Sequence, residues 1–151
     1  MRSSFLLTIV MIYVSSGFSQ DRHLDLALIE HTINNYFEGY VERDIDKLNL
    51  AFDIENGTMK VPILSNNIVT GYENRFFKEL VITWGKREKL SAERLKNCTL
   101  KILNIDMDQG KIATAKISMK VEDVTYIDIL SLQKINNQWK ITNKIYHTLY
   151  D

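Results

Sequence analysis

Four strand-like segments fill the last third of the chain and constrain its fold more than any other feature. They cover residues 100–107, 111–121, 124–135 and 138–148 and are rich in Ile, Val, Thr and Tyr, which favour β-strands. Short polar segments separate them: Asp108-Gln109-Gly110, Glu122-Asp123 and Asn136-Asn137. Because connections this short join antiparallel neighbours, the pattern predicts a four-stranded antiparallel meander.

The segments before these strands have the spacing of helices. Apolar residues recur every three or four positions over residues 24–42, which predicts an amphipathic helix, and Asp44 is suited to cap a short second helix. Residues 53–72 indicate an irregular hairpin and residues 73–84 a further helix, followed by a charged connection. Helices that precede a run of strands indicate an α+β fold in which the helices cover one face of the sheet.

Composition excludes several classes of protein. The 151 residues are 45% hydrophobic and 25% charged, with one Pro and six Gly, which is typical of one globular domain. Nineteen basic residues balance nineteen acidic ones, so nucleic acid is not expected as a partner. Three scattered His and one Cys provide no metal-ligand spacing, and the chain has no glycine-rich phosphate loop. The sequence therefore predicts no bound metal and no cofactor.

The N-terminus has the pattern of a secretory signal peptide. Arg2 precedes the apolar run of residues 5–14, and small polar residues follow. Residues 1–19 are therefore predicted to be removed before Gln20, which leaves residues 20–151 as a single exported domain, periplasmic or extracellular. A buried N-terminal strand and an uncleaved anchor are the alternatives. The apolar run is short for a membrane span, and no Cys follows it, so no stable membrane anchor is expected.

Side-chain alternation predicts which face of the meander is buried. A turn at Asn136-Asn137 pairs Asn143 with Leu130, Ile145 with Asp128 and His147 with Tyr126. The apolar face then extends to Leu103 and Ile105 of the first strand, whereas Lys116 and Lys144 point outward.

Four polar residues fall together on this apolar face: Tyr126, Asp128, Asn143 and His147. A carboxylate among apolar side chains costs several kcal/mol unless it is hydrogen-bonded, paired or in contact with water. Two interpretations follow. The cluster either lines a cavity beneath the helices, or it forms a polar network that joins helix and sheet and satisfies its own hydrogen bonds.

Several motifs resemble those of a known family. They are His31-Thr32-Ile33-x-x-Tyr36-Phe37-Glu38-Gly39-Tyr40, Asp44-x-x-Lys47-Leu48-x-x-Ala51-Phe52, Ala115-Lys116, Asp128-x-Leu130-x-Leu132 and Trp139-Lys140-Ile141-x-Asn143-Lys144-x-x-His147. Their order and spacing over most of residues 24–148 resemble the putative lumazine-binding family. That family lies in the nuclear-transport-factor-2-like superfamily, with SnoaL-like cyclases and ketosteroid isomerase. The resemblance implies a cone, often dimeric, in which a curved antiparallel sheet wraps around a long N-terminal helix. Residues 53–97 match no part of the family pattern.

The first functional hypothesis is a secreted domain that binds a cyclic or heteroaromatic small molecule in the cavity of the cone. Such sites combine aromatic walls with a few polar groups that orient the ligand. The residues expected to contact the ligand are Tyr36, Tyr40, Trp84, Tyr126, Asp128, Trp139, Asn143 and His147. For each aromatic residue, plain core packing is the alternative.

Two other hypotheses come from different classes. In the first, the chain is an enzyme of ketosteroid-isomerase or SnoaL-like type, with Asp128 as general base and His147 or Tyr126 as its proton partner. In the second, the chain is an interaction module that forms a homodimer through the outer sheet face, where Ile127, Ile129 and Tyr146 supply an apolar strip.

Overall fold

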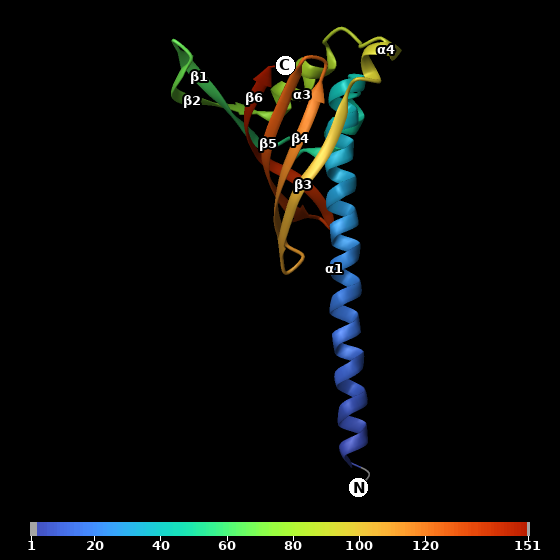
Figure 1. Cartoon of the computed structure of the whole chain (residues 1–151). Helices are drawn as coiled ribbons and strands as arrows, with labels where there is room; N and C mark the ends of the chain where they lie inside the picture. Colours follow the sequence, from blue (N-terminus) through green and yellow to red (C-terminus); the bar gives the residue numbers. More distant parts are fainter. Residues whose placement is uncertain (1–2, 151) are drawn as a thin grey trace.

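A curved sheet wraps around one long helix in the computed structural model, which describes the backbone of residues 3–150 and side chains over residues 21–150 (Figure 1). In chain order the elements are α1 (Ser3–Glu42), α2 (Ile45–Ala51), β1 (Thr58–Ser65), β2 (Ile68–Phe76), α3 (Phe77–Gly85), α4 (Ala92–Leu95), β3 (Thr99–Asp108), β4 (Ile112–Val121), β5 (Val124–Ile135) and β6 (Gln138–Tyr150).

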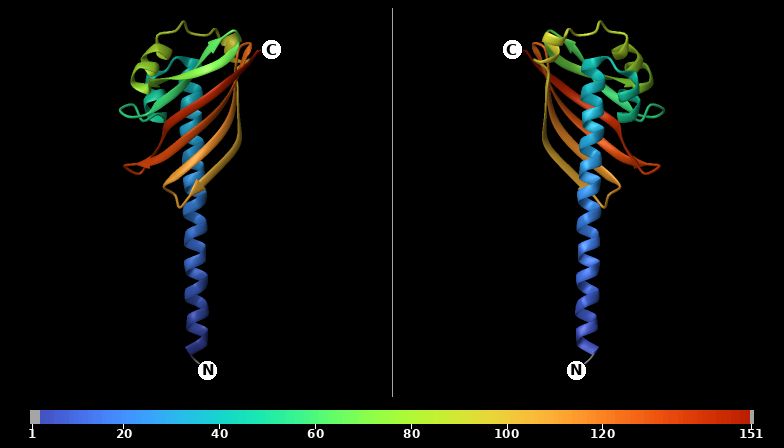
Figure 2. Two further views of the ribbon diagram at one scale, coloured as in Figure 1. Left: turned by 90° about the vertical axis from the view of Figure 1, so that its left-hand side faces the viewer. Right: turned by 90° about the vertical axis from the view of Figure 1, so that its right-hand side faces the viewer.

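The sheet has six strands in the order β2-β1-β6-β5-β4-β3. The predicted meander is confirmed as β3 to β6, and the hairpin β1–β2 extends it because β1 pairs in parallel with β6. Figure 2 shows α1 lying along the concave face of this unclosed sheet. We call this the inner face and the opposite one the outer face. The α+β class and the cone-like architecture are therefore confirmed.

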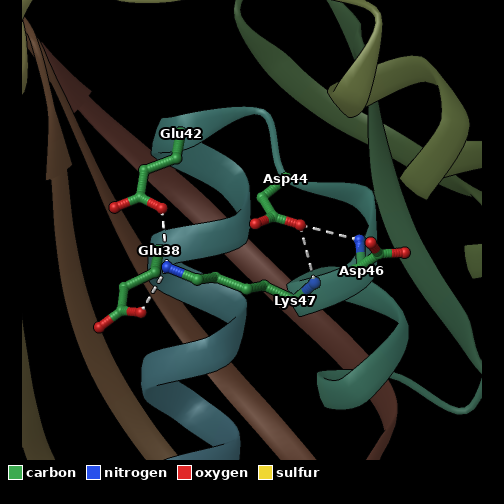
Figure 3. Close-up of polar contacts among 5 residues, drawn as sticks. All are labelled: Glu38, Glu42, Asp44, Asp46 and Lys47. Carbon is green, nitrogen blue, oxygen red and sulfur yellow. Dashed lines mark hydrogen bonds and ion pairs between the residues drawn. The ribbon is translucent and has the colours of Figure 1, made fainter.

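Helix α1 buries its apolar stripe against the sheet, as its spacing predicts. Ile29, Ile33 and Tyr36 are fully buried, whereas His31 is exposed on the opposite side. The Asp44 carboxylate caps α2 by accepting hydrogen bonds from the backbone N–H groups of Asp46 and Lys47, at 2.9 and 3.1 Å (Figure 3). The cap confirms the predicted start of the second helix.

Lys47 ties α2 back to α1. Its ammonium group lies 2.9 Å from Glu38 Oε2 and 2.7 Å from Glu42 Oε2 (Figure 3). Glu38 and Glu42 stand one turn apart on α1, where their like charges repel each other. The hydrogen bonds that Lys47 donates to both carboxylates raise its pKa, so its charge is maintained at neutral pH and offsets that repulsion.

Two predictions in the middle of the chain are wrong. Residues 73–76 belong to β2 instead of a helix, because Glu73 and Arg75 pair with Val61 and Met59 of β1. Tertiary pairing thus overrides local helical spacing, and α3 begins only at Phe77. The connection that follows contains the short helix α4, which was not predicted.

The pairing of β4 with β5 is regular, from Ile112 opposite Gln133 to Val121 opposite Val124, but the register predicted between β5 and β6 is wrong beyond Ile141. Ile141 pairs with Leu132, whereas Asn143 pairs with Ser131, so Thr142 is an extra residue that forms a bulge. A one-residue insertion reverses every later side chain. Asn143 and His147 therefore leave the inner face, which corrects their predicted position.

The same bulge turns other β6 side chains inward. Lys144, predicted to face outward, is 3% exposed, and Tyr146 is partly buried against the core. Ile145, predicted to face inward, is 42% exposed. A second bulge lies between Ile102 and Asn104 in β3 and leaves Leu103 half exposed, although Ile105 packs against the core as predicted.

The predicted signal peptide, residues 1–19, is not tested. Residues 1 and 2 lie outside the described part of the chain, and only the backbone of residues 3–19 is described, as the start of α1. This part of α1 extends beyond the sheet (Figure 1). Among the residues described, no helix combines the length and hydropathy needed to cross a membrane.

Candidate ligand site

A buried ion pair lies at the centre of the inner face. Lys144 Nζ of β6 stands 2.7 Å from Asp128 Oδ2 of β5, and the Tyr36 hydroxyl of α1 donates to the same oxygen at 2.9 Å. Lys144 also donates to the Tyr36 hydroxyl. Asp128 is fully buried. Lys144 is directly opposite Leu130, two residues along β5 from Asp128, so Asp128 and Lys144 are diagonal neighbours on the same face of the sheet. The sheet and the helix therefore meet through this three-residue cluster.

Three tyrosine rings surround the ammonium group of Lys144. Its Nζ lies 5.0 Å from the ring centroid of Tyr36, 5.1 Å from that of Tyr146 and 5.8 Å from that of Tyr126. Aromatic faces carry negative charge density and stabilise a cation at such distances. Because Tyr126 and Tyr146 are partly exposed, they connect the buried ion pair with the surface.

Burial keeps these phenols protonated. It raises the pKa of Tyr36 well above its ordinary value, and the charge of Asp128 adds to the effect. Burial likewise raises the pKa of Tyr126 and of Tyr146. Each phenol therefore keeps an O–H group that can donate a hydrogen bond at neutral pH.

One polar atom of the cluster lacks a partner. Asp128 Oδ1 is buried and accepts no hydrogen bond from the residues that the structure describes. A buried carboxylate oxygen without a donor is energetically unfavourable, and a well-packed apolar replacement of a buried ion pair is often more stable. The cluster is therefore poorly explained by stability alone and well suited to a molecule that brings a hydrogen-bond donor.

The other predicted aromatic residues pack against one another in the same region. The ring of Tyr36 lies 6.3 Å from those of Tyr40 and Trp84, and 5.0 Å from that of Phe52. Tyr40 also contacts Tyr126 at 6.1 Å. These side chains pack against one another beneath the helices, in the region where a cavity was expected.

Trp139 and Asn143 lie apart from this cluster. Trp139 Nε1 donates to Asp25 Oδ1 at 2.9 Å in a second buried group that includes Lys134. Asn143 donates to the backbone and side-chain oxygens of Thr58, where β1 joins β6. Neither residue contacts Asp128 directly.

His147 does not contact Asp128 either, since it is exposed on the outer face. Lys144 and Tyr146 are the site residues that the sequence interpretation placed on the wrong face. For Lys144 the sequence contained a signal in its charge. A buried carboxylate needs a cation, and Lys144 comes next to Asp128 when the register of the last strand shifts by one residue. Within the described residues, no group of three or more His, Cys, Asp or Glu side chains could hold a metal ion.

A comparison with protein families matches residues 25–147 to the family described as "Putative lumazine-binding". The match begins within α1, at Asp25, and ends within β6, at His147. This chain belongs to that family. Asp128, Lys144 and Tyr36 all lie within the part that the lumazine-binding family pattern covers.

Solved structures share the fold. A nuclear-transport-factor-2-like protein of unknown function from Shewanella baltica is 22% identical, with a TM-score of 0.69 over 89% of this chain and 98% of its own. A similar protein from Methylobacillus flagellatus is 21% identical, with a TM-score of 0.65 over 83% and 92%. A ketosteroid isomerase-like protein from Erwinia carotovora atroseptica is 13% identical, with a TM-score of 0.56 over 84% and 98%. No curated protein matches the chain.

Proposed function

We propose that this member of the lumazine-binding family binds a cyclic or heteroaromatic small molecule at Asp128, Lys144 and Tyr36. The observation that carries the proposal is the unpartnered Oδ1 atom of Asp128, buried beside an ammonium group and three phenols. A structural ion pair satisfies its own atoms, whereas a binding site leaves capacity for the ligand.

The chemistry of the cluster favours a particular kind of ligand. Asp128 Oδ1 requires a donor. The Tyr36 hydroxyl already donates to Asp128 Oδ2, so Lys144, which has three N–H groups, and the partly exposed phenols of Tyr126 and Tyr146 are the groups that can donate to an acceptor on the ligand. A flat ring whose edge carries an N–H beside a C=O meets both needs and stacks against tyrosine. Lumazines, pterins and flavins have such an edge, whereas a steroid ketone offers only the acceptor.

Access depends on the two partly exposed rings. Tyr126 and Tyr146, whose centroids are 6.3 Å apart, lie between Lys144 and the surface. Since Tyr36, Tyr40 and Trp84 are buried among one another, we place entry of the ligand at Tyr126 and Tyr146, which must rotate aside.

The test is a thermal-shift screen of the chain from Gln20 onward with lumazine, a pterin, a flavin and a steroid. A ligand at 100 times its Kd stabilises the folded state by about 2.7 kcal/mol, which raises the melting temperature by several degrees. We expect shifts with the first three compounds and none with the steroid. Asp128→Asn and Lys144→Met should abolish them, while Lys101→Met, an exposed control, should not. A screen without any shift contradicts the proposal.

Catalysis by Asp128 is a second proposal, favoured by the Tyr36 hydroxyl 2.9 Å from its carboxylate. In this proposal Tyr36 or Lys144 replaces His147 as the proton-donating neighbour, because His147 faces outward. If a compound found in the screen is turned over, Asp128→Asn should abolish the reaction, with circular dichroism to identify conditions in which the variant is folded. Unchanged turnover removes Asp128 from the role.

Export and dimerisation remain predictions of the sequence. Mass spectrometry of the processed protein should give an N-terminus at Gln20. For the outer-face homodimer, Ile127 and Ile129 remain on that face, but the bulge in β6 turns Tyr146 to the inner one. Sedimentation of the wild type and Ile129→Glu tests it: a wild-type dimer that this variant splits supports it, and a wild-type monomer contradicts it.

A further inference from the structure

A hollow of about 810 Å³ lies on the outer face of the sheet, next to the hairpin β1–β2. This hairpin projects away from α1 (Figure 1). The volume is in the range typical of small-molecule pockets, roughly 300–1,000 Å³. We call it the outer pocket. Its lining includes Tyr146, one of the three rings around Lys144, but not Asp128, which is buried beneath the helices.

The floor of the outer pocket is apolar. It is formed by Ile127, Ile129 and Ile145 of the central strands β5 and β6. Ile129 and Ile145 are direct cross-strand partners and are 45% and 42% exposed, so they present one continuous apolar surface. Tyr72 of β2 adds an aromatic side chain that is 62% exposed. Contiguous exposed apolar surface of this kind marks a binding site more often than scattered residues do.

The rim of the outer pocket is positive. Lys60 pairs with Ile145, and Lys116 pairs with Ile129, so a Lys-Ile-Ile-Lys row crosses four adjacent strands. His147 is a third basic group of the lining, which includes no Asp or Glu. Within the described residues, none of these three side chains forms an ion pair. The charges of the two lysines are therefore available to an anion.

We infer that the outer pocket binds an amphipathic organic anion, with its apolar body on the isoleucines and its acid group at the lysines. The dimensions agree with this inference, because Lys60 and Lys116 are three strand spacings apart, about 14 Å between backbones. Both side chains can therefore reach over the body of a two-ring or medium-chain acid.

A second copy of the chain fits this face less well. A symmetric dimer through the outer pocket would bury Lys60 and Lys116 of both copies in one interface, and like charges close together oppose association. An anion neutralises the lysines and covers the isoleucines at the same time.

The test compares two dyes that differ in one charge. 8-Anilinonaphthalene-1-sulfonate carries an acid group on an aromatic body, and N-phenyl-1-naphthylamine has the same rings without the acid. We expect the wild type to bind the sulfonate at least tenfold more tightly than the neutral dye. The double variant Lys60→Gln/Lys116→Gln should lose that preference and keep its affinity for the neutral dye.

The control variant Lys101→Gln/Lys111→Gln removes two exposed lysines outside the lining and should retain the preference. Three results would overturn the inference: equal affinity of the wild type for both dyes, an unchanged preference in the Lys60/Lys116 variant, or a wild-type dimer that Ile129→Glu splits and that binds neither dye. These results concern the outer face alone and leave the thermal-shift test of Asp128 unaffected.

Discussion

Lys144 is the residue on which the candidate site most depends. Its ammonium group is almost fully buried and compensates the charge of Asp128 at 2.7 Å. Removal of one member of a buried ion pair leaves the other without compensation, which is more harmful than removal of both. Variants that lack one member of the Asp128–Lys144 pair should therefore be less stable than a variant that lacks both.

We expect Lys144→Met to lower the free energy of unfolding by about 3–5 kcal/mol, because Asp128 would remain buried without a cation. The double variant Asp128→Leu/Lys144→Met should recover most of that loss. Urea unfolding of the wild type, the single variants Lys144→Met and Asp128→Leu, and the double variant measures the effect. If the double variant is as unstable as the sum of two single variants, the two residues do not act as a pair.

Asp25 provides a prediction about pH. Burial by itself would raise its pKa, but hydrogen bonds from Lys134 Nζ at 2.7 Å and Trp139 Nε1 at 2.9 Å lower the pKa below its ordinary value. A carboxyl group whose pKa falls on folding contributes its full stabilisation above the unfolded-state pKa of about 4. The contribution is lost as the pH falls through the folded-state pKa.

Asp25→Asn should therefore lower the free energy of unfolding at pH 7 by about 1–3 kcal/mol. The difference from the wild type should shrink at pH 3, where the wild type begins to lose the same interaction. Urea unfolding at both pH values measures it. Asp21→Asn, one turn earlier in α1 and exposed, serves as the control and should have little effect. An Asp25 effect that is equal at both pH values contradicts an ionic origin.

At the scale of elements, bulges and turns decide where side chains point. The turn between β5 and β6 has positive φ at both Asn136 and Asn137, as a two-residue hairpin requires, and it fixes the register up to Ile141. The bulge at Thr142 then changes that register where β1 pairs with β6. A bulge re-aims side chains, and here it exchanges His147 for Lys144 on the inner face.

Gly110, in the turn between β3 and β4, gives the prediction at this scale. Its φ is +65°, and a Cβ atom there would lie 2.6 Å from Asp25 Oδ2. Gly110→Ala combines backbone strain with a clash, so we expect the free energy of unfolding to fall by about 1–3 kcal/mol. Gly71→Ala is the matched control, because its Cβ would come no nearer than 3.9 Å to Ile63. Thermal unfolding measures both variants, and an equal loss of stability in the two would contradict this explanation.

At the scale of the whole molecule, the sheet and α1 share one core, while the first part of α1 extends beyond it (Figure 1). Asp25, Thr32 and Tyr36 are the residues of α1 whose described hydrogen bonds link it to β5 and β6: Asp25 accepts from Lys134 and Trp139, and Thr32 and Tyr36 donate. All three follow the expected cleavage position before Gln20. Removal of residues 1–19 is therefore compatible with an intact domain.

We expect a chain that starts at Gln20 to unfold cooperatively, since it keeps every one of these contacts. A chain that starts at Ile29 loses Asp25 and should melt several degrees lower, because Lys134 and Trp139 lose their shared acceptor. Thermal unfolding followed by circular dichroism compares the two. Equal melting temperatures would show that the N-terminal end of the domain contributes little to stability.

Local sequence determined most of the architecture. Alternating apolar residues, the turn residues and the stripe of α1 specify the meander, the hairpins and the buried face, and they place Asp128 among apolar neighbours, because these signals act between residues close in the chain. Only the tertiary structure decided that β1 lies parallel to β6, that residues 73–76 continue β2, and that Lys144 instead of His147 faces Asp128. Those choices depend on pairing and charge compensation between residues far apart in sequence. A shift of one residue in a strand is nearly neutral locally, yet it exchanges the two faces of the sheet.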